Sequence, residues 1–135
     1  MAAYNKFNSL VADLANKVHN LGSDTLKMAL TNVAPAATNT VLANITEISY
    51  TNCSARTITT TSSTQTSGLY KLVLADLVLT ASGAVGPFRY LVLYNDTAVS
   101  DQLIGYYDYG SAITLQTGDT FTIDFSSVNG VIQLT

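Results

Sequence analysis

The sequence predicts a mainly β protein: an antiparallel β-sandwich or jelly-roll-like domain with one N-terminal amphipathic helix. The first observation is the stretch over residues 69–95, LYKLVLADLVLTASGAVGPFRYLVLYN, whose apolar segments are broken by one glycine-proline loop. The second is a series of about eight short strand-like segments separated by frequent turns. The third is an apolar repeat of three and four residues near the N-terminus. At 135 residues we expect a single domain over 1–135, with an arm over 1–5, a helix over 6–20 and a β domain over 24–135.

The helix is predicted by one apolar stripe on a polar background. A stop follows at residues 20–22, where Gly22 suits a left-handed cap. His19 falls in the last predicted turn, where the helix dipole favours positive charge, so we expect it to be a capping or surface residue. The stripe must be buried against a sheet or a partner subunit, and its members are Phe7, Leu10, Val11, Leu14 and Val18.

The next segments predict strands of unequal regularity. Residues 25–32 alternate, with Leu26, Met28 and Leu30 on one face, which indicates a half-buried strand. Residues 33–40 indicate a loop, and Ile45 and Ile48 a short irregular strand. The threonine-rich residues 51–67 fit either a strand or a mobile loop, and we favour an exposed strand over 56–61. Such an exposed edge is a natural place for pairing with another chain.

The central stretch has apolar residues on both faces of its segments, as in strands buried on both sides. The loop over residues 81–87 contains Gly83, Gly86 and Pro87, which we expect to stop the strand pairing. A sheet core explains this pattern, and a ligand-lined β pocket is the alternative interpretation.

The C-terminal third continues the β pattern. Residues 102–109 predict a strand interrupted at Gly105 by a bulge, and residues 111–115 a further short strand. After a turn at 117–119, residues 120–125 alternate with Phe121, Ile123 and Phe125 inward. The pair at 129–130, Asn-Gly, predicts a hairpin in which residues 131–135 pair back.

The composition argues against several classes of partner. Charged residues make up 11% of the chain, against about 25% in an ordinary soluble domain, which indicates either a surface covered by other subunits or a threonine-rich surface on a monomer. The formal net charge of −3 and the scattered basic residues disfavour binding of a nucleic-acid backbone. No apolar run reaches the roughly 20 residues of a membrane span, and we see no signal peptide. We therefore expect neither nucleic acid nor a membrane as partner.

The residues capable of chemistry form no recognisable constellation. The lone Cys53 and the lone His19 are distant in sequence, so an inert thiol is favoured over a catalytic pair. Asp96 and Asp101 flank one loop and are the candidate carboxylate pair, although Asp in loops is usually turn chemistry. We find no nucleophile-elbow, phosphate-loop or metal-binding motif. We therefore predict no enzyme, with no catalytic, cofactor-binding or metal-binding residues and no cofactor.

Three segments carry a resemblance to a known group of proteins. They are KFNSLVADLANKVHNLGSDTLKMALTNVAPAATNT (residues 6–40), GPFRYLVLYNDT (86–97) and LIGYYDYGSAITLQTGDTFTIDF (103–125). Together they resemble small virion structural proteins of tailed bacteriophages. The resemblance covers most of the chain and excludes residues 52–66, which fit the family least well.

The resemblance implies a non-enzymatic component of a virion assembled in the bacterial cytoplasm. Within that class we favour a decoration or cementing protein that binds the outer capsid. Its expected partners are the major capsid protein, copies of itself, or both. The alternatives are a tail, baseplate or fibre-associated protein, and a β-sandwich that binds carbohydrate or a host surface.

The predicted interface combines the arm, the threonine-rich edge and a tyrosine cluster. Tyrosines give amphipathic contact area typical of interfaces, with core packing as the equal alternative. The predicted interface residues are Tyr4, Phe7, Thr57, Thr59, Thr61, Tyr106, Tyr107 and Tyr109.

Overall fold

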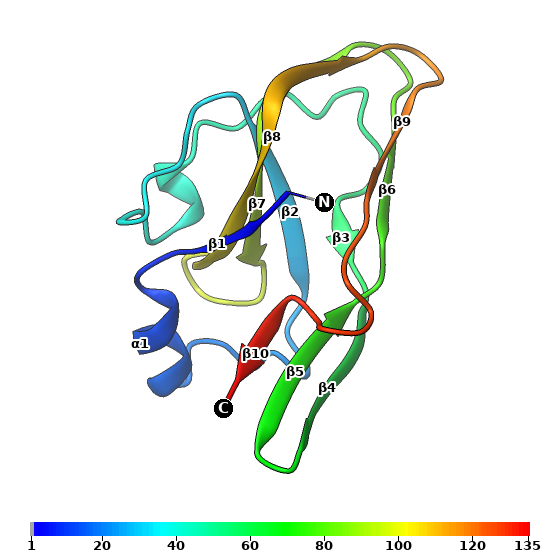
Figure 1. Cartoon of the computed structure of the whole chain (residues 1–135). Coiled ribbons are helices and arrows are strands. Elements are labelled where there is room, and N and C mark those ends of the chain that lie inside the picture. Colours follow the sequence, from blue (N-terminus) through cyan, green and yellow to red (C-terminus); the bar gives the residue numbers. More distant parts are fainter. Residues whose placement is uncertain (1) are drawn as a thin grey trace.

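The computed structural model describes residues 2–135 and is mainly β, with antiparallel sheets and one short helix near the N-terminus (Figure 1). The largest sheet has the strand order β1-β8-β7-β2-β3. A three-stranded sheet has the order β10-β5-β4, and β6 pairs with β9. The predicted fold class is confirmed.

The strands vary widely in length. The five-stranded sheet contains β1 (Tyr4–Lys6), β2 (Leu26–Thr31), β3 (Thr57–Ile58), β7 (Val85–Asn95) and β8 (Leu103–Leu115). The smaller sheets contain β4 (Thr60–Thr66), β5 (Leu69–Leu74), β6 (Leu77–Thr80), β9 (Thr120–Ile123) and β10 (Ile132–Leu134). The helices are α1 (Leu10–Ala15) and the 3₁₀ turn η1 (Leu42–Asn44).

The five-stranded sheet is covered on both faces. On one face, Leu91 and Leu93 of β7 join a large core cluster with residues of both smaller sheets, such as Leu72 and Leu79. This packing of sheets across a shared core is sandwich-like. On the other face, Val92 joins a second cluster, against which η1 and the following loop pack. Residues 91–94 alternate between the two cores, so this part of β7 is buried on both sides as predicted. The same prediction was wrong for β6, where Val78 is 51% exposed.

β2 was expected to be half-buried and is buried on both sides instead. Met28 faces the large cluster, and its neighbour Ala29 faces the second one, with no exposed surface on either. The reason is the excursion after β2, which folds back over the outer face of the sheet. Within it the expected strand at Ile45 and Ile48 is absent, and Ile45 packs on the second cluster. The Ile48 amide donates a hydrogen bond to the Leu30 carbonyl at 3.0 Å.

The N-terminal helix is shorter than the predicted 6–20. α1 covers only Leu10–Ala15, and the residues before it form β1, so the predicted arm over 1–5 is in part a sheet strand. Met1, the first residue of that arm, lies outside the described residues. The predicted stripe is split: Phe7 precedes the helix and is buried, whereas Val11 is 56% exposed. The left-handed residue after the helix is Lys17, at φ 66°, and not Gly22.

Two turn predictions were wrong. Gly86 and Pro87 do not stop the strand: they lie inside β7, at an irregular register between Val85 and Phe88. The residues after Asn129 do not pair back on the preceding strand, because β10 pairs with β5. Gly130 instead closes a turn with Ser126 at φ 72°, which directs the chain across to the other sheet.

Gly105 marks the bulge that the sequence predicts. The register of β8 on β7 shifts between Leu93 and Tyr94, whose partners are Gly105 and Leu103. The ring of Tyr4 from β1 lies directly over Gly105, and the Tyr4 hydroxyl donates to the Ile104 carbonyl at 3.3 Å. Because Gly105 has no side chain, it leaves space for the ring of Tyr4 and so lets β1 pack against β8.

We predict that Gly105→Ala destabilises the protein by about 1–3 kcal/mol, because overpacking forces neighbours to move. The added Cβ would lie only 2.1 Å from a ring carbon of Tyr4, which must shift and loosen β1. Urea unfolding followed by circular dichroism measures the change. Gly22→Ala is the matched control: its Cβ meets nothing closer than 3.4 Å, so we expect at most about 0.5 kcal/mol. Equal effects of both substitutions would contradict this account.

Candidate functional site

The eight predicted interface residues fall into three groups in the structure. Thr57, Thr59, Thr61 and Tyr109 are exposed. Tyr4 and Tyr106 are half-buried, and each contacts a ring within the chain: Tyr107 lies 5.8 Å from Tyr4, and Phe7 lies 5.3 Å from Tyr106. Phe7 and Tyr107 are 0% and 4% exposed. The prediction that they lie at an interface was therefore wrong, and both are core residues. Burial raises the pKa of the Tyr107 hydroxyl to about 12.

Tyr109 begins a protrusion on β8. Pairing with β7 runs from Ile113 opposite Phe88 to Asp108 opposite Tyr90, so residues 109–112 lie opposite only Arg89. All four residues of this bulge are exposed, and Gly110 adopts φ 94°. The bulge turns the Tyr109 side chain out of the sheet and toward β9.

A charged clamp fixes the base of the bulge. The Arg89 guanidinium donates two hydrogen bonds to the Asp108 carboxylate, at 2.8 and 3.1 Å. The same carboxylate accepts the Gly110 amide at 2.8 Å. The Arg89 hydrogen bonds hold the pKa of Asp108 below its usual range. The clamp links β7, β8 and the bulge at one point, directly beside Tyr109.

An aromatic cleft lies beside the bulge. It has a volume of about 210 Å³, below the roughly 300 Å³ at which small-molecule pockets begin, so it fits a single side chain or sugar ring. The Tyr109 and Phe121 rings lie 5.3 Å apart at 59°. Thr122 and Asp124 add polar groups at one side. The remaining lining residues are Ala2, Leu91, Tyr107 and Ile123.

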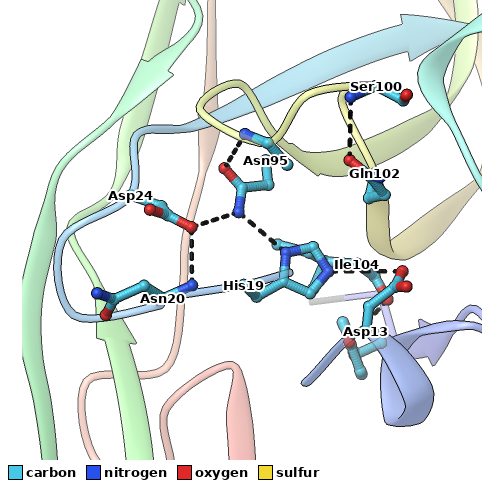
Figure 2. A network of polar contacts seen from close by, with 10 residues as sticks. Asp13, His19, Asn20, Asp24, Asn95, Ser100, Gln102 and Ile104 are labelled. Carbon is cyan, nitrogen blue, oxygen red and sulfur yellow. Dashed lines mark hydrogen bonds and ion pairs between the residues drawn. The ribbon is translucent and has the colours of Figure 1, made fainter. Parts of the chain in front are cut away.

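A second polar cluster is buried between α1 and the end of β7 (Figure 2). The Asn95 side-chain amide donates to Asp24 at 2.6 Å and lies 2.9 Å from Nδ1 of His19. The Asn95 side-chain oxygen accepts the amides of Thr97 and Ala98, which fixes the orientation of the group. Because its nitrogen can only donate, Nδ1 of His19 is the acceptor and the proton of the neutral ring sits on Nε2. Nε2 lies 3.9 Å from Asp13, and within residues 2–135 neither that atom nor the facing Asp13 oxygen has a hydrogen-bond partner.

His19 is therefore not the surface or capping residue that the sequence suggests. Its side chain is fully buried, and this burial lowers its pKa, with Asp13 and Asp24 opposing the shift. The sequence could not place it, because the partner Asn95 lies 76 residues away.

In both candidate catalytic pairs, Cys53 with His19 and Asp96 with Asp101, each member contacts a different part of the structure from its proposed partner. Cys53 forms a β-bridge with Ala81 beside β6, and burial raises the pKa of its thiol, whereas His19 contacts the end of β7. Asp96 lies 3.4 Å from the ammonium of Lys27. Asp101 contributes its backbone instead, since its carbonyl accepts the Leu42 amide.

Two further findings concern residues 2–135. No group of three or more His, Cys, Asp or Glu residues there is arranged to hold a metal ion. The helices in this range are too short, or insufficiently apolar, to cross a membrane.

Two features of the surface were missed by sequence reasoning. The Arg89–Asp108 clamp joins residues from facing strands, and only the strand register brings them together. In the second, the Arg56 guanidinium lies 3.5 Å above the Tyr50 ring and donates to the Met28 carbonyl at 2.7 Å. An arginine a few residues from a tyrosine in a loop gives no pattern that predicts such stacking.

Comparisons with protein-family models, with curated proteins and with solved structures found no match.

We predict that protein stability falls as the pH drops below about 6.5, the ordinary pKa of histidine. Because the pKa of His19 is lowered in the folded state, the unfolded chain binds the proton first, and acidification favours unfolding. His19 is the single histidine, so this pH window reports on it alone among the side chains. The free energy of unfolding, measured in urea at intervals from pH 7.5 to 5.5, gives the slope.

His19→Asn is the matched variant, since it has no titrating ring. It should unfold with nearly constant free energy over the same interval, whatever its absolute stability. An unchanged slope in His19→Asn would show that another group titrates there.

Proposed function

We propose that this chain is a non-enzymatic structural protein of a tailed-phage virion, most specifically a decoration or cementing protein on the outer capsid. The sequence resemblance over residues 6–40, 86–97 and 103–125 supports this assignment. The low proportion of charged residues also supports it, because a surface that is covered in an assembly needs little charge.

The structural observation that carries the proposal is the bulge with its exposed Tyr109. A half-exposed tyrosine anchored by the Arg89–Asp108 clamp beside an apolar cleft has the features of a binding hot spot. We assign this surface to contact with the capsid protein.

The test is the copy number of the chain in purified particles of the phage that encodes it, measured by mass spectrometry against the major capsid protein. Hundreds of copies in a simple ratio to the capsid protein are the expected result. A few to some dozens would indicate a tail, baseplate or fibre position. Absence from the particle would overturn the virion assignment.

We predict that Tyr109→Ala lowers the number of bound copies, because it removes the aromatic anchor while the sheet below stays intact. A binding assay with particles lacking the chain measures this directly. Val99→Ala is the control, since Val99 is fully exposed on the loop between β7 and β8 and is not among the residues that line the cleft, and it should bind as the unmodified protein does. Equal binding by both variants would remove Tyr109 from the interface.

A second candidate function is binding of carbohydrate in the same cleft. The specific observation in its favour is the combination of exposed Tyr109 with the polar groups of Thr122 and Asp124 at the cleft edge. An aromatic face stacks on the apolar face of a sugar, and a carboxylate accepts hydrogen bonds from its hydroxyls.

Under this second candidate, a matching glycan would change the tyrosine fluorescence, which is unobscured because the chain has no tryptophan. Tyr109→Phe should then bind nearly as well as the unmodified protein, and Tyr109→Ala roughly threefold to tenfold more weakly. No change across a broad glycan set would remove this candidate.

A further inference from the structure

β4 presents a long sheet edge without a backbone partner in the part of the chain that the structure describes. It lies at the border of the β10-β5-β4 sheet, and its seven residues pair only with β5. Figure 1 shows this hairpin extending from the lower side of the molecule. Among the described residues, the backbone of β4 forms hydrogen bonds with β5 and with no other element. Every second residue of β4 therefore directs its N–H and C=O groups toward solvent.

The other borders of the sheets are shorter, covered or interrupted. β9 has four residues, β1 and β10 have three each, and β3 has two. The part of β8 beyond its pairing with β1 carries the bulge at residues 109–112. Beside β3, the edge of β2 is closed by the Ile48 amide and by Arg56, which bind backbone carbonyls of β2. The outer edge of β6 is bonded to Ser54, whose amide donates to the Thr80 carbonyl.

β4 also lacks the residues that usually protect an exposed edge. Its sequence, TTSSTQT, contains no lysine, no other charge and no proline. One irregularity interrupts it, between Thr60 and Ser62, and the following five residues pair with β5 without a break. The flat, neutral part of the edge is therefore residues 62–66, centred on Thr64.

We propose that β4 pairs with β4 of a second copy of this chain, antiparallel across a two-fold axis at Thr64. The two three-stranded sheets would then form one six-stranded sheet. This register sets Thr64 opposite its own copy and Ser62 opposite Thr66, so one face carries hydroxyl pairs only. Thr–Thr and Thr–Ser pairs across strands are favourable, and a two-fold contact requires this kind of self-complementarity.

Charge does not oppose a second copy as the occupant of this edge. The chain has a net charge of −3, so two copies repel each other wherever acidic surfaces meet, and β4 is neutral. The only charged residue on the strands of this sheet is Lys71 of β5, opposite Thr64. Two such lysines would be separated by three strand spacings, about 14 Å, which is beyond the screening length of about 8 Å at physiological salt.

The size of the contact sets the expected strength. A seven-residue edge buries less than the roughly 800 Å² per partner of a standard stable interface. The free protein should therefore associate weakly and in proportion to its concentration. The inference concerns only the surface of this chain and goes beyond the virion role proposed above.

Disulfide trapping tests the pairing and its register. At the two-fold centre the Thr64 Cα atoms would lie about 4.5–5.5 Å apart, within the range that a disulfide spans. In a Cys53→Ser background, Thr64→Cys should form a covalent dimer on mild oxidation. Val99→Cys, exposed on the loop between β7 and β8, is the control and should stay monomeric. Equal cross-linking at both positions would overturn the inference.

Sedimentation of the full chain over a range of concentrations gives the second readout. The unmodified protein and Thr64→Ser should self-associate, and Thr64→Lys should do so roughly tenfold more weakly or worse, because it sets two like charges opposite each other. A protein that is monomeric throughout, or a Thr64→Lys variant that associates as the unmodified chain does, overturns the pairing. Neither result changes the copy number in particles, so the virion proposal stands or fails separately.

Discussion

Burial of the five-stranded sheet on both faces is the constraint on which the rest of the structure depends. Two long strands, β7 and β8, cannot expose a hydrophobic face, so the smaller sheets cover one side and the segment after β2 covers the other. Each covering element is short or irregular and has little stability by itself. The two surface features lie where this covering is incomplete: the bulge of β8 lies beside β9, and β4 is the outer strand of a covering sheet.

The sequence predicts the elements whose burial is periodic, and it fails where distant residues decide the outcome. The period-two apolar pattern of β7 leads to a strand that is buried on both sides over residues 91–94, and the turn at Gly118 and the bulge at Gly105 follow from local chemistry. The helix is overestimated because Phe7 and Val18 continue the apolar spacing of Leu10 and Leu14. Phe7 instead joins the core behind the sheet, since β1 draws the chain into sheet geometry before the helix begins.

The same reasoning explains the candidate surfaces. Threonine-rich composition predicts an exposed strand near residues 56–61, because such residues tolerate both water and a pleated backbone. The structure divides the segment differently: β3 belongs to the central sheet with Ile58 buried, and the exposed edge is β4, Thr60–Thr66. The bulge that presents Tyr109 arises because four residues of β8 lie opposite the single residue Arg89 of β7. No pattern in the sequence near Tyr109 predicts this register. His19 is placed by Asn95 and Asp24, which are close to it only in three dimensions.

The passage of residues 57–66 from one sheet to the other also has a mechanical meaning. β3 is bonded to β2 in the central sheet, and one residue later β4 belongs to the outer sheet, with the Thr59 carbonyl bonded to Ala75. β4 is also paired with β5 at six register positions, whereas β3 and β2 share two. A pull on β4 would therefore be divided between the outer sheet, across the β4-β5 pairing, and the central sheet, along the chain through β3.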